Sequence, residues 1–176
     1  MIVAPKSKLL KQRQGDAPTI VQILPAMIRG GVERGTVEMA DAIQKHGGRA
    51  IVISRGGPMV RHLDRLGAKH YQLDVHTKNP FRWPQVRRQL KAILSRENAD
   101  LVHIRSRVPA WIALPAAAAL GIATVSTVHG RFIALSALKR MYNRKLLKTD
   151  HVIAISNYVK DLIISQYVDV RERLTV

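Results

Sequence analysis

The sequence predicts an α/β domain of the Rossmann-like type, with a doubly wound parallel sheet covered by helices. Short apolar runs rich in Val and Ile alternate along the chain with longer segments whose apolar residues repeat at helical spacing. Most of the short runs are apolar without alternating with polar residues, as expected of strands buried on both faces of a sheet. This alternation requires parallel pairing through right-handed crossovers.

Six runs are predicted strands, because β-branched residues cluster in all but the third, weaker run and turn residues follow most of them. They cover residues 19–24, 49–54, 69–73, 100–104, 122–128 and 151–155. Residues 168–176 begin a further element, with the edge of a strand at 173–176. We therefore expect a sheet of about six or seven strands.

Helices are predicted between the strands, from apolar residues spaced three and four apart. The glycine pair 47–48 ends the first helix, Pro80 opens the third in its first turn, and Ser156 or Asn157 caps the last. The predicted helices cover residues 32–46, 59–66, 79–97, 109–120, 134–148 and 157–167.

The run from Val108 to Val128 carries no charge and is long enough in principle to cross a bilayer. Pro109, Pro115 and Gly121 interrupt it, and alanine, which is only weakly apolar, dominates its middle. These features favour a buried helix followed by a buried strand over a transmembrane helix.

The chain is strongly basic, with 29 Lys and Arg against 12 Asp and Glu and a formal net charge of +17 at pH 7. Such a field attracts nucleic acid, anionic lipid headgroups or phosphorylated substrates. The 176 residues contain no cysteine, which excludes disulfides and suits a reducing cytoplasm. We expect one domain over residues 19–176.

Residues 1–18 are polar and basic and lack the apolar core of a secretory signal. We interpret them as a flexible leader. The alternative is that Lys6, Lys8, Lys11 and Arg13 tether the chain to an anionic membrane.

Ligands of open parallel sheets bind beyond the carboxyl ends of the strands. After the first strand, Gly30 and Gly31 precede a helix, where backbone N–H groups and the helix dipole favour an anion. The alternative there is a tight turn and a helix start. After the fourth strand, Arg105 and Arg107 are candidates for an anionic ligand or are solvated charges. His103, inside that strand, is expected to be packed and hydrogen-bonded rather than reactive.

Two further loops follow the fifth and sixth strands. His129 stands where an apolar strand ends, so its imidazole is expected to point into the cleft, and Gly130 behind it allows close backbone approach. We favour a functional role for His129. For Ser156 and Asn157, helix capping is a sufficient explanation.

Other catalytic and metal-binding patterns are absent from the sequence. It has no His-Glu-x-x-His helix, no Gly-x-Ser-x-Gly elbow and no Walker loop, and its 7 His lack metal-ligand spacing. We predict neither a metal site nor a cofactor.

Four motifs occur in order and cover nearly all of residues 19–176. They are Gly30-Gly31-Val32-Glu33-Arg34, Asp100-Leu101-Val102-His103, Ser126-Thr127-Val128-His129-Gly130 and Val152-Ile153-Ala154-Ile155-Ser156. The ordered set resembles the amino-terminal domain of retaining GT-B glycosyltransferases of the lipopolysaccharide and sucrose-synthase-like group.

The resemblance implies two Rossmann-like domains facing a cleft, of which this chain is the acceptor-side domain. It implies a nucleotide-sugar donor as substrate, retention of configuration and no metal. His129 would be the catalytic residue near the transferred sugar. The residues implied in substrate or phosphate binding are Gly30, Gly31, Arg34, Arg105, Ser106, Gly130 and Arg131.

In this group a pair of glutamates lies in a carboxy-terminal, donor-binding domain, which the sequence does not contain. We therefore expect an isolated half that cannot turn over alone. A non-catalytic sugar-binding module with the same fold is the alternative.

The predicted helix at 134–148 is basic, and Leu135, Leu138, Tyr142 and Leu146 form an apolar face on it. Such a helix suits an anionic membrane surface. We expect a lipid-linked or saccharide acceptor, a role in lipopolysaccharide and cell-envelope biosynthesis, and a cytoplasmic protein at the inner face of the plasma membrane. The alternative is a surface helix with an ordinary core stripe.

The positive charge also permits a basic nucleic-acid-binding module. Only 5% of the residues are aromatic, and no stacking platform or recognition-helix motif is visible. We therefore expect no nucleic acid among the partners.

Overall fold

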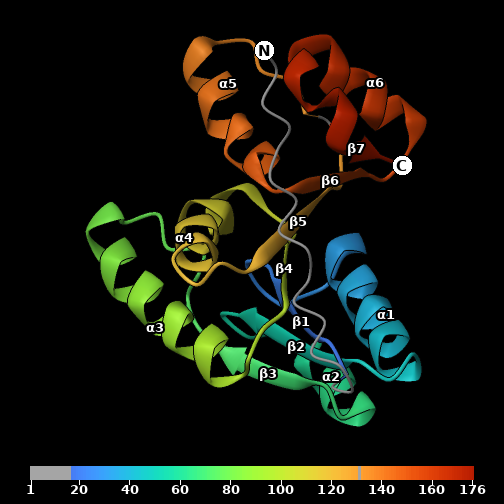
Figure 1. The fold of residues 1–176 in the computed structure, drawn as a ribbon, viewed down its shortest axis with the longest axis vertical. Helices are drawn as coiled ribbons and strands as arrows, with labels where there is room; N and C mark the ends of the chain where they lie inside the picture. Colours follow the sequence, from blue (N-terminus) through green and yellow to red (C-terminus); the bar gives the residue numbers. More distant parts are fainter. Residues whose placement is uncertain (1–16, 131) are drawn as a thin grey trace.

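The computed structural model describes residues 17–130 and 132–176, in which seven strands form one all-parallel sheet (Figure 1). The Rossmann-like α/β fold predicted from the sequence is confirmed. The strands are β1 (Thr19–Ile23), β2 (Arg49–Ser54), β3 (Lys69–Gln72), β4 (Leu101–Ile104), β5 (Ala123–Val128), β6 (His151–Ala154) and β7 (Leu174–Thr175).

The strands follow the spatial order β3-β2-β1-β4-β5-β6-β7, so the direction of winding reverses between β1 and β4. The register aligns the carboxyl ends of the central strands: Ile23 of β1 pairs with Ile104 of β4, which pairs with Ser126 of β5. Strand β5 continues to Val128. The loops after β1, β4 and β5 therefore leave the sheet at one edge.

Helices cover both faces of the sheet. Helices α1 and α2 pack on one face, and α3 and α4 pack together on the other (Figure 1). The helices are α1 (Gly31–Lys45), α2 (Val60–Leu66), α3 (Trp83–Arg96), α4 (Arg107–Ala118), α5 (Ala137–Arg144) and α6 (Asn157–Gln166), with short 3₁₀ helices η1 (Pro80–Arg82), η2 (Leu146–Lys148) and η3 (Val168–Arg173).

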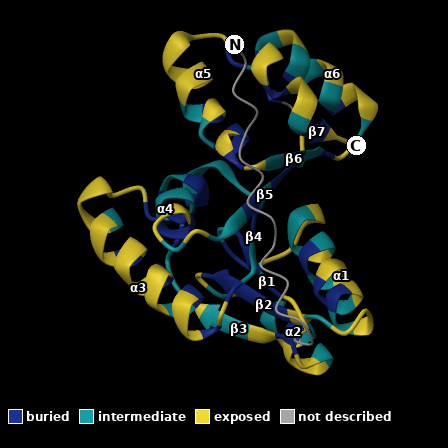
Figure 2. Ribbon diagram, in the orientation of Figure 1, coloured by how far each residue is buried: buried dark blue, intermediate teal, exposed yellow. Residues whose placement is uncertain are grey.

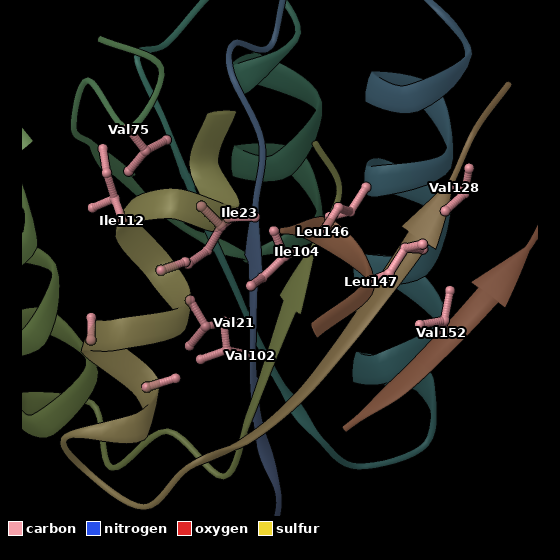
Figure 3. Close-up of a cluster of buried hydrophobic side chains, with 14 of the residues drawn as sticks. Val21, Ile23, Val75, Val102, Ile104, Ile112, Val128, Leu146, Leu147 and Val152 are labelled. Atoms are coloured by element: carbon pink, nitrogen blue, oxygen red, sulfur yellow. The ribbon is translucent and has the colours of Figure 1, made fainter. Parts of the chain in front are cut away.

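The larger core lies between the sheet and the α3–α4 layer (Figure 3). Alternate residues of the central strands, such as Val21 and Ile23 of β1 and Val102 and Ile104 of β4, are fully buried there. The opposite residues of the strands face α1 and α2, where Val52 joins a second, smaller core. The central strands are thus buried on both faces, as their largely apolar character predicted.

A buried carboxylate joins three elements at the amino edge of the sheet. Glu97, 4% exposed, follows α3 and accepts hydrogen bonds from Lys69 Nζ at 2.8 Å, from the Tyr71 hydroxyl at 2.5 Å and from Arg49 at 2.9 Å. The hydrogen bond from Lys69, followed by that from Tyr71, lowers the pKa of Glu97 to about 2. This cluster ties α3 to β2 and β3.

Two predicted helices are shorter or divided in the structure. The helix predicted over 134–148 consists of α5, which begins after Ser136, and the separate turn η2. The Ser136 hydroxyl accepts the Lys139 N–H at 3.2 Å and so caps α5 at that point. Residues 79–97 are similarly divided, because the Asn79 side chain accepts from Phe81 N and forms η1 before α3 begins.

Helix α4 occupies the region where a buried helix was predicted, and it begins two residues earlier, at Arg107. Pro109 lies in its first turn, where a missing N–H costs no hydrogen bond. Within residues 17–130 and 132–176, no helix combines the length and apolar character needed to span a bilayer. The predicted leader lies mostly outside the described residues.

Candidate active site

A cavity of about 260 Å³ opens at the carboxyl edge of the sheet, between the ends of β4 and β5. Residues 105–107 and 127–130 form two of its walls, and Val32 from the first turn of α1 contributes a third. Phe132 and Leu146 complete the lining. The cavity therefore stands beside the reversal of strand order, where ligands of open α/β sheets bind.

Arg105 is the most buried charged group in the lining of this cavity. Only 6% of the residue is exposed, and its NH1 donates to Gln22 Oε1 at 2.9 Å. Gln22 is fully buried in β1, and its Nε2 donates to the Thr36 carbonyl of α1 at 3.0 Å. One amide thus fixes the guanidinium relative to both the sheet and α1.

The rest of the guanidinium keeps its capacity to bind an anion. Among the described residues, Arg105 Nε is buried without a hydrogen-bond partner. Burial lowers the pKa of Arg105 to about 10, and nearby Glu33 opposes this effect, so the side chain stays charged at neutral pH. A buried donor without a partner is costly, and an anionic ligand would satisfy it.

His103 is packed and hydrogen-bonded, as its place inside a strand predicted. It is 4% exposed, and its Nε2 lies 2.7 Å from the Thr127 hydroxyl of β5. Burial, then the charge of Arg105, lowers the pKa of His103 to about 3. A neutral His103 in β4 is therefore hydrogen-bonded to Thr127 of β5, which lines the cavity.

His129 lines the cavity immediately after β5. Its Nε2 is buried and has no hydrogen-bond partner within the described part of the chain. Burial, then the charge of Arg105, lowers the pKa of His129 to about 4. The neutral ring has one donor and one acceptor nitrogen, and it has no proton to give as an imidazolium at pH 7.

Arg107 adds a second cation, at the amino end of α4. Its NH1 donates to Asn143 Oδ1 at 2.9 Å, and its guanidinium lies 5.4 Å from the centre of the Phe132 ring. Asn143 is fully buried, and Phe132 is 2% exposed. These two contacts hold a planar cation at the mouth of the cavity.

The structure brings together four of the predicted site residues. Arg105, Ser106, His129 and Gly130 all line the cavity. Arg34 does not: its Nε lies 2.8 Å from Glu38 Oε1, and its side chain is 80% exposed on the outside of α1.

Gly30 and Gly31 lie at the start of α1, next to Val32, but do not line the cavity. A Cβ at Gly30 would lie 2.7 Å from Glu33 Oε2, so this carboxylate lies at the glycine loop. Glu33 therefore already supplies negative charge to the helix amino terminus. The predicted site residue Arg131 falls outside the described residues.

Gln22 and Thr127 belong to the site but were not among the predicted residues. A glutamine in the middle of the apolar run 19–24 is a visible signal, because a buried amide requires hydrogen-bond partners. The sequence does not indicate which partners it has.

After β6, the Ser156 hydroxyl accepts from Val159 N at 3.3 Å, which matches the predicted helix cap.

Comparison with solved structures identifies the fold. A glycosyltransferase from Rickettsia africae is 35% identical with a TM-score of 0.80, and the match covers 91% of this chain and 42% of that one. HepE from Anabaena, in complex with UDP and glucose, is 14% identical with a TM-score of 0.69, covering 89% and 43%. MurG from Acinetobacter baumannii is 14% identical with a TM-score of 0.62, covering 81% and 42%.

The chain thus spans less than half the length of these proteins. Its fold matches an amino-terminal GT-B domain, as the motifs predicted. No curated protein sequence gives a significant match. Residues 29–176 match the family model described as Glycosyltransferase Family 4. The chain therefore belongs to glycosyltransferase family 4.

Proposed function

We propose that this domain is the acceptor-side half of a glycosyltransferase that moves a sugar from a nucleotide-sugar donor with retention of configuration. The observation that carries the proposal is the cavity lined by charged Arg105 and neutral His129, each of which also has a buried nitrogen without a partner in the described residues. Family membership and the resemblance to HepE, whose structure holds UDP and glucose, support a nucleotide-sugar donor.

Each side chain has a separate task in this proposal. A departing nucleoside diphosphate gains charge as the sugar becomes oxocarbenium-like, and Arg105, held in place by Gln22, stabilises that charge. His129 donates or accepts a hydrogen bond at the sugar and orients it. Its lowered pKa suits this role better than that of a general acid at pH 7.

Retention is consistent with attack on the same face of the sugar. In the described part of the chain, neither Asp nor Glu lines the cavity, so it supplies no carboxylate nucleophile for a covalent intermediate. We propose that the nucleotide binds mainly to a second, carboxy-terminal Rossmann-like domain with the paired glutamates. The 176-residue chain would then be inactive alone.

The proposed acceptor is lipid-linked, and the proposed location is the cytoplasmic face of the plasma membrane. Helix α5 is exposed over much of its length (Figure 2), and it carries Lys139, Arg140 and Arg144 together with exposed Leu138 and Met141. Basic and apolar side chains on one exposed helix suit an anionic bilayer surface. Flotation with anionic vesicles and none with neutral ones is the expected result, whereas equal flotation with both would contradict the attachment.

The family match favours this function over a nucleic-acid-binding module. A chimera that joins this chain to the carboxy-terminal half of the Rickettsia africae glycosyltransferase, which is 35% identical over the matched region, tests it. We expect the chimera to transfer sugar from a panel of nucleotide sugars, and the 176-residue chain to transfer none. Transfer by the 176-residue chain alone would contradict the division of labour between two domains.

A further inference from the structure

A second cavity, of about 420 Å³, lies beside the candidate active site at the start of α5. Its lining residues are Arg107, Ile133, Leu135, Ser136 and Lys139. Arg107 also lines the first cavity, and in the described residues it is the sole residue common to both. A ligand in the second cavity would therefore contact the same arginine as a ligand in the candidate active site.

The second cavity is positively charged. Arg107 and Lys139 line it, no carboxylate does so in the described residues, and neither cation takes part in the ion pairs found there. Arg107 is held by Asn143 and Phe132, so binding an anion does not require ordering a mobile side chain. The Ser136 hydroxyl accepts the Lys139 N–H and can still donate its own hydrogen.

An apolar surface continues from this cavity onto α5. Leu135, which lines the cavity, is 97% exposed, and Leu138 and Met141 are 76% and 59% exposed. Leu135 and Leu138, two residues of the apolar face predicted on this segment, are therefore exposed rather than packed in the core. Large apolar side chains gathered beside cations suit a ligand with a charged head and a hydrocarbon chain.

We propose that the second cavity binds the phosphate of the acceptor, and that the acceptor is a phosphate carried on a lipid chain. Arg107, Lys139 and the Ser136 hydroxyl bind the phosphate oxygens, and the lipid chain lies against Leu135, Leu138 and Met141. This inference rests on the proposed function and narrows its acceptor class. In this arrangement Arg107 lies between the acceptor phosphate and the cavity proposed to hold the transferred sugar.

Binding of dihexanoyl phosphatidic acid, kept below its micelle concentration, tests the site on the 176-residue chain by calorimetry. Losing a charged hydrogen bond weakens binding by about tenfold, so Arg107→Gln and Lys139→Gln should each do so. Lys160→Gln is the matched control, because Lys160 lines a different cavity, of about 510 Å³, along α6. Circular dichroism checks that each variant folds.

Two further probes separate lipid phosphate from free phosphate. Glycerol 3-phosphate should bind more weakly than the lipid. Leu138→Gln should lower the affinity for the lipid and leave the affinity for glycerol 3-phosphate unchanged. Neutral octyl glucoside should not displace the lipid. Equal affinity for glycerol 3-phosphate and the lipid would overturn the lipid assignment.

An equal loss in Lys160→Gln would show attraction to the overall positive charge and overturn the site. Absence of lipid binding also overturns it. The lipid-binding results do not depend on the nucleotide-sugar donor. If the chimera transfers sugar while phosphatidic acid fails to bind, this inference fails and the proposed function stands. If the lipid binds at Arg107 and Lys139 and no chimera transfers sugar, the proposed function fails.

Discussion

Gln22 and Arg105, 83 residues apart in the sequence, meet at the carboxyl edge of the sheet, where Arg105 NH1 donates to Gln22 Oε1 at 2.9 Å. The contact forms because β1 and β4 are neighbours with Ile23 opposite Ile104. It converts a potentially solvated arginine into a fixed, buried charge.

Replacing Gln22 with Leu should leave the Arg105 guanidinium without that acceptor. We expect a loss of about 1–3 kcal/mol in the free energy of unfolding, the usual cost of an unpaired buried donor. Urea denaturation of Gln22→Leu, Arg105→Leu and the double variant measures it. The double variant should lose less than the sum of the single losses, and strict additivity would show that the two side chains do not interact.

The Glu97 cluster predicts a pH dependence of stability. The pKa of Glu97 lies near 2 in the folded protein, below the ordinary 4.5. The ionised carboxylate therefore contributes its full stabilisation above pH 4.5, and this stabilisation is lost as the pH falls toward 2. At pH 7, Glu97→Gln should therefore unfold at lower urea concentration than the parent. The difference in unfolding free energy between the parent and Glu97→Gln should decrease steadily below pH 4.5. A difference that stays constant would exclude a charge-based role for Glu97.

His129 should remain neutral at pH values well below the pKa of an ordinary histidine. Its pKa of about 4, against 6.5, means that the unfolded chain binds the proton first, so this residue lowers stability as the pH falls from 6.5 to 4. NMR titration of the ring Cε1–H signal should give a midpoint near 4. A midpoint near 6.5 would show that the ring is solvated rather than buried in the cavity.

The division between α5 and η2 predicts opposite results for two leucines of the same predicted stripe. Leu146 is 3% exposed and Leu138 is 76% exposed. Leu146→Ala should cost about 2–5 kcal/mol in unfolding free energy because it leaves a core cavity. Leu138→Ala should change stability by less than about 0.5 kcal/mol. Similar losses in the two variants would mean that α5 packs in the core.

The periodicity of the sequence was sufficient to predict the strands and the site edge. The six strands predicted between residues 19 and 155 all form, and 168–176 supplies η3 and the short β7. Once parallel pairing is assumed, residues after β4 and β5 must emerge together, so Arg105, Ser106, His129 and Gly130 were predictable.

What could not be predicted depends on contacts between distant segments. The spacing of Leu135, Leu138 and Leu146 is the same whether a helix faces the core or solvent, and only the structure shows that the first two are exposed while Leu146 is buried. The Arg34 side chain lies along α1 because Glu38, one turn later, attracts it. Local pattern also gives no means of pairing Gln22 with Arg105.

The central claim, that the cavity beside β4 and β5 is where the sugar and its leaving phosphate are held, is tested most directly by kcat/KM for sugar transfer by the chimera. We predict that Arg105→Gln lowers kcat/KM by about 100-fold or more, as loss of a preorganised charge does. His129→Ala should also lower it, while Arg88→Gln, on the exposed side of α3, leaves it unchanged. Full kcat/KM in folded Arg105→Gln and His129→Ala chimeras would contradict the account.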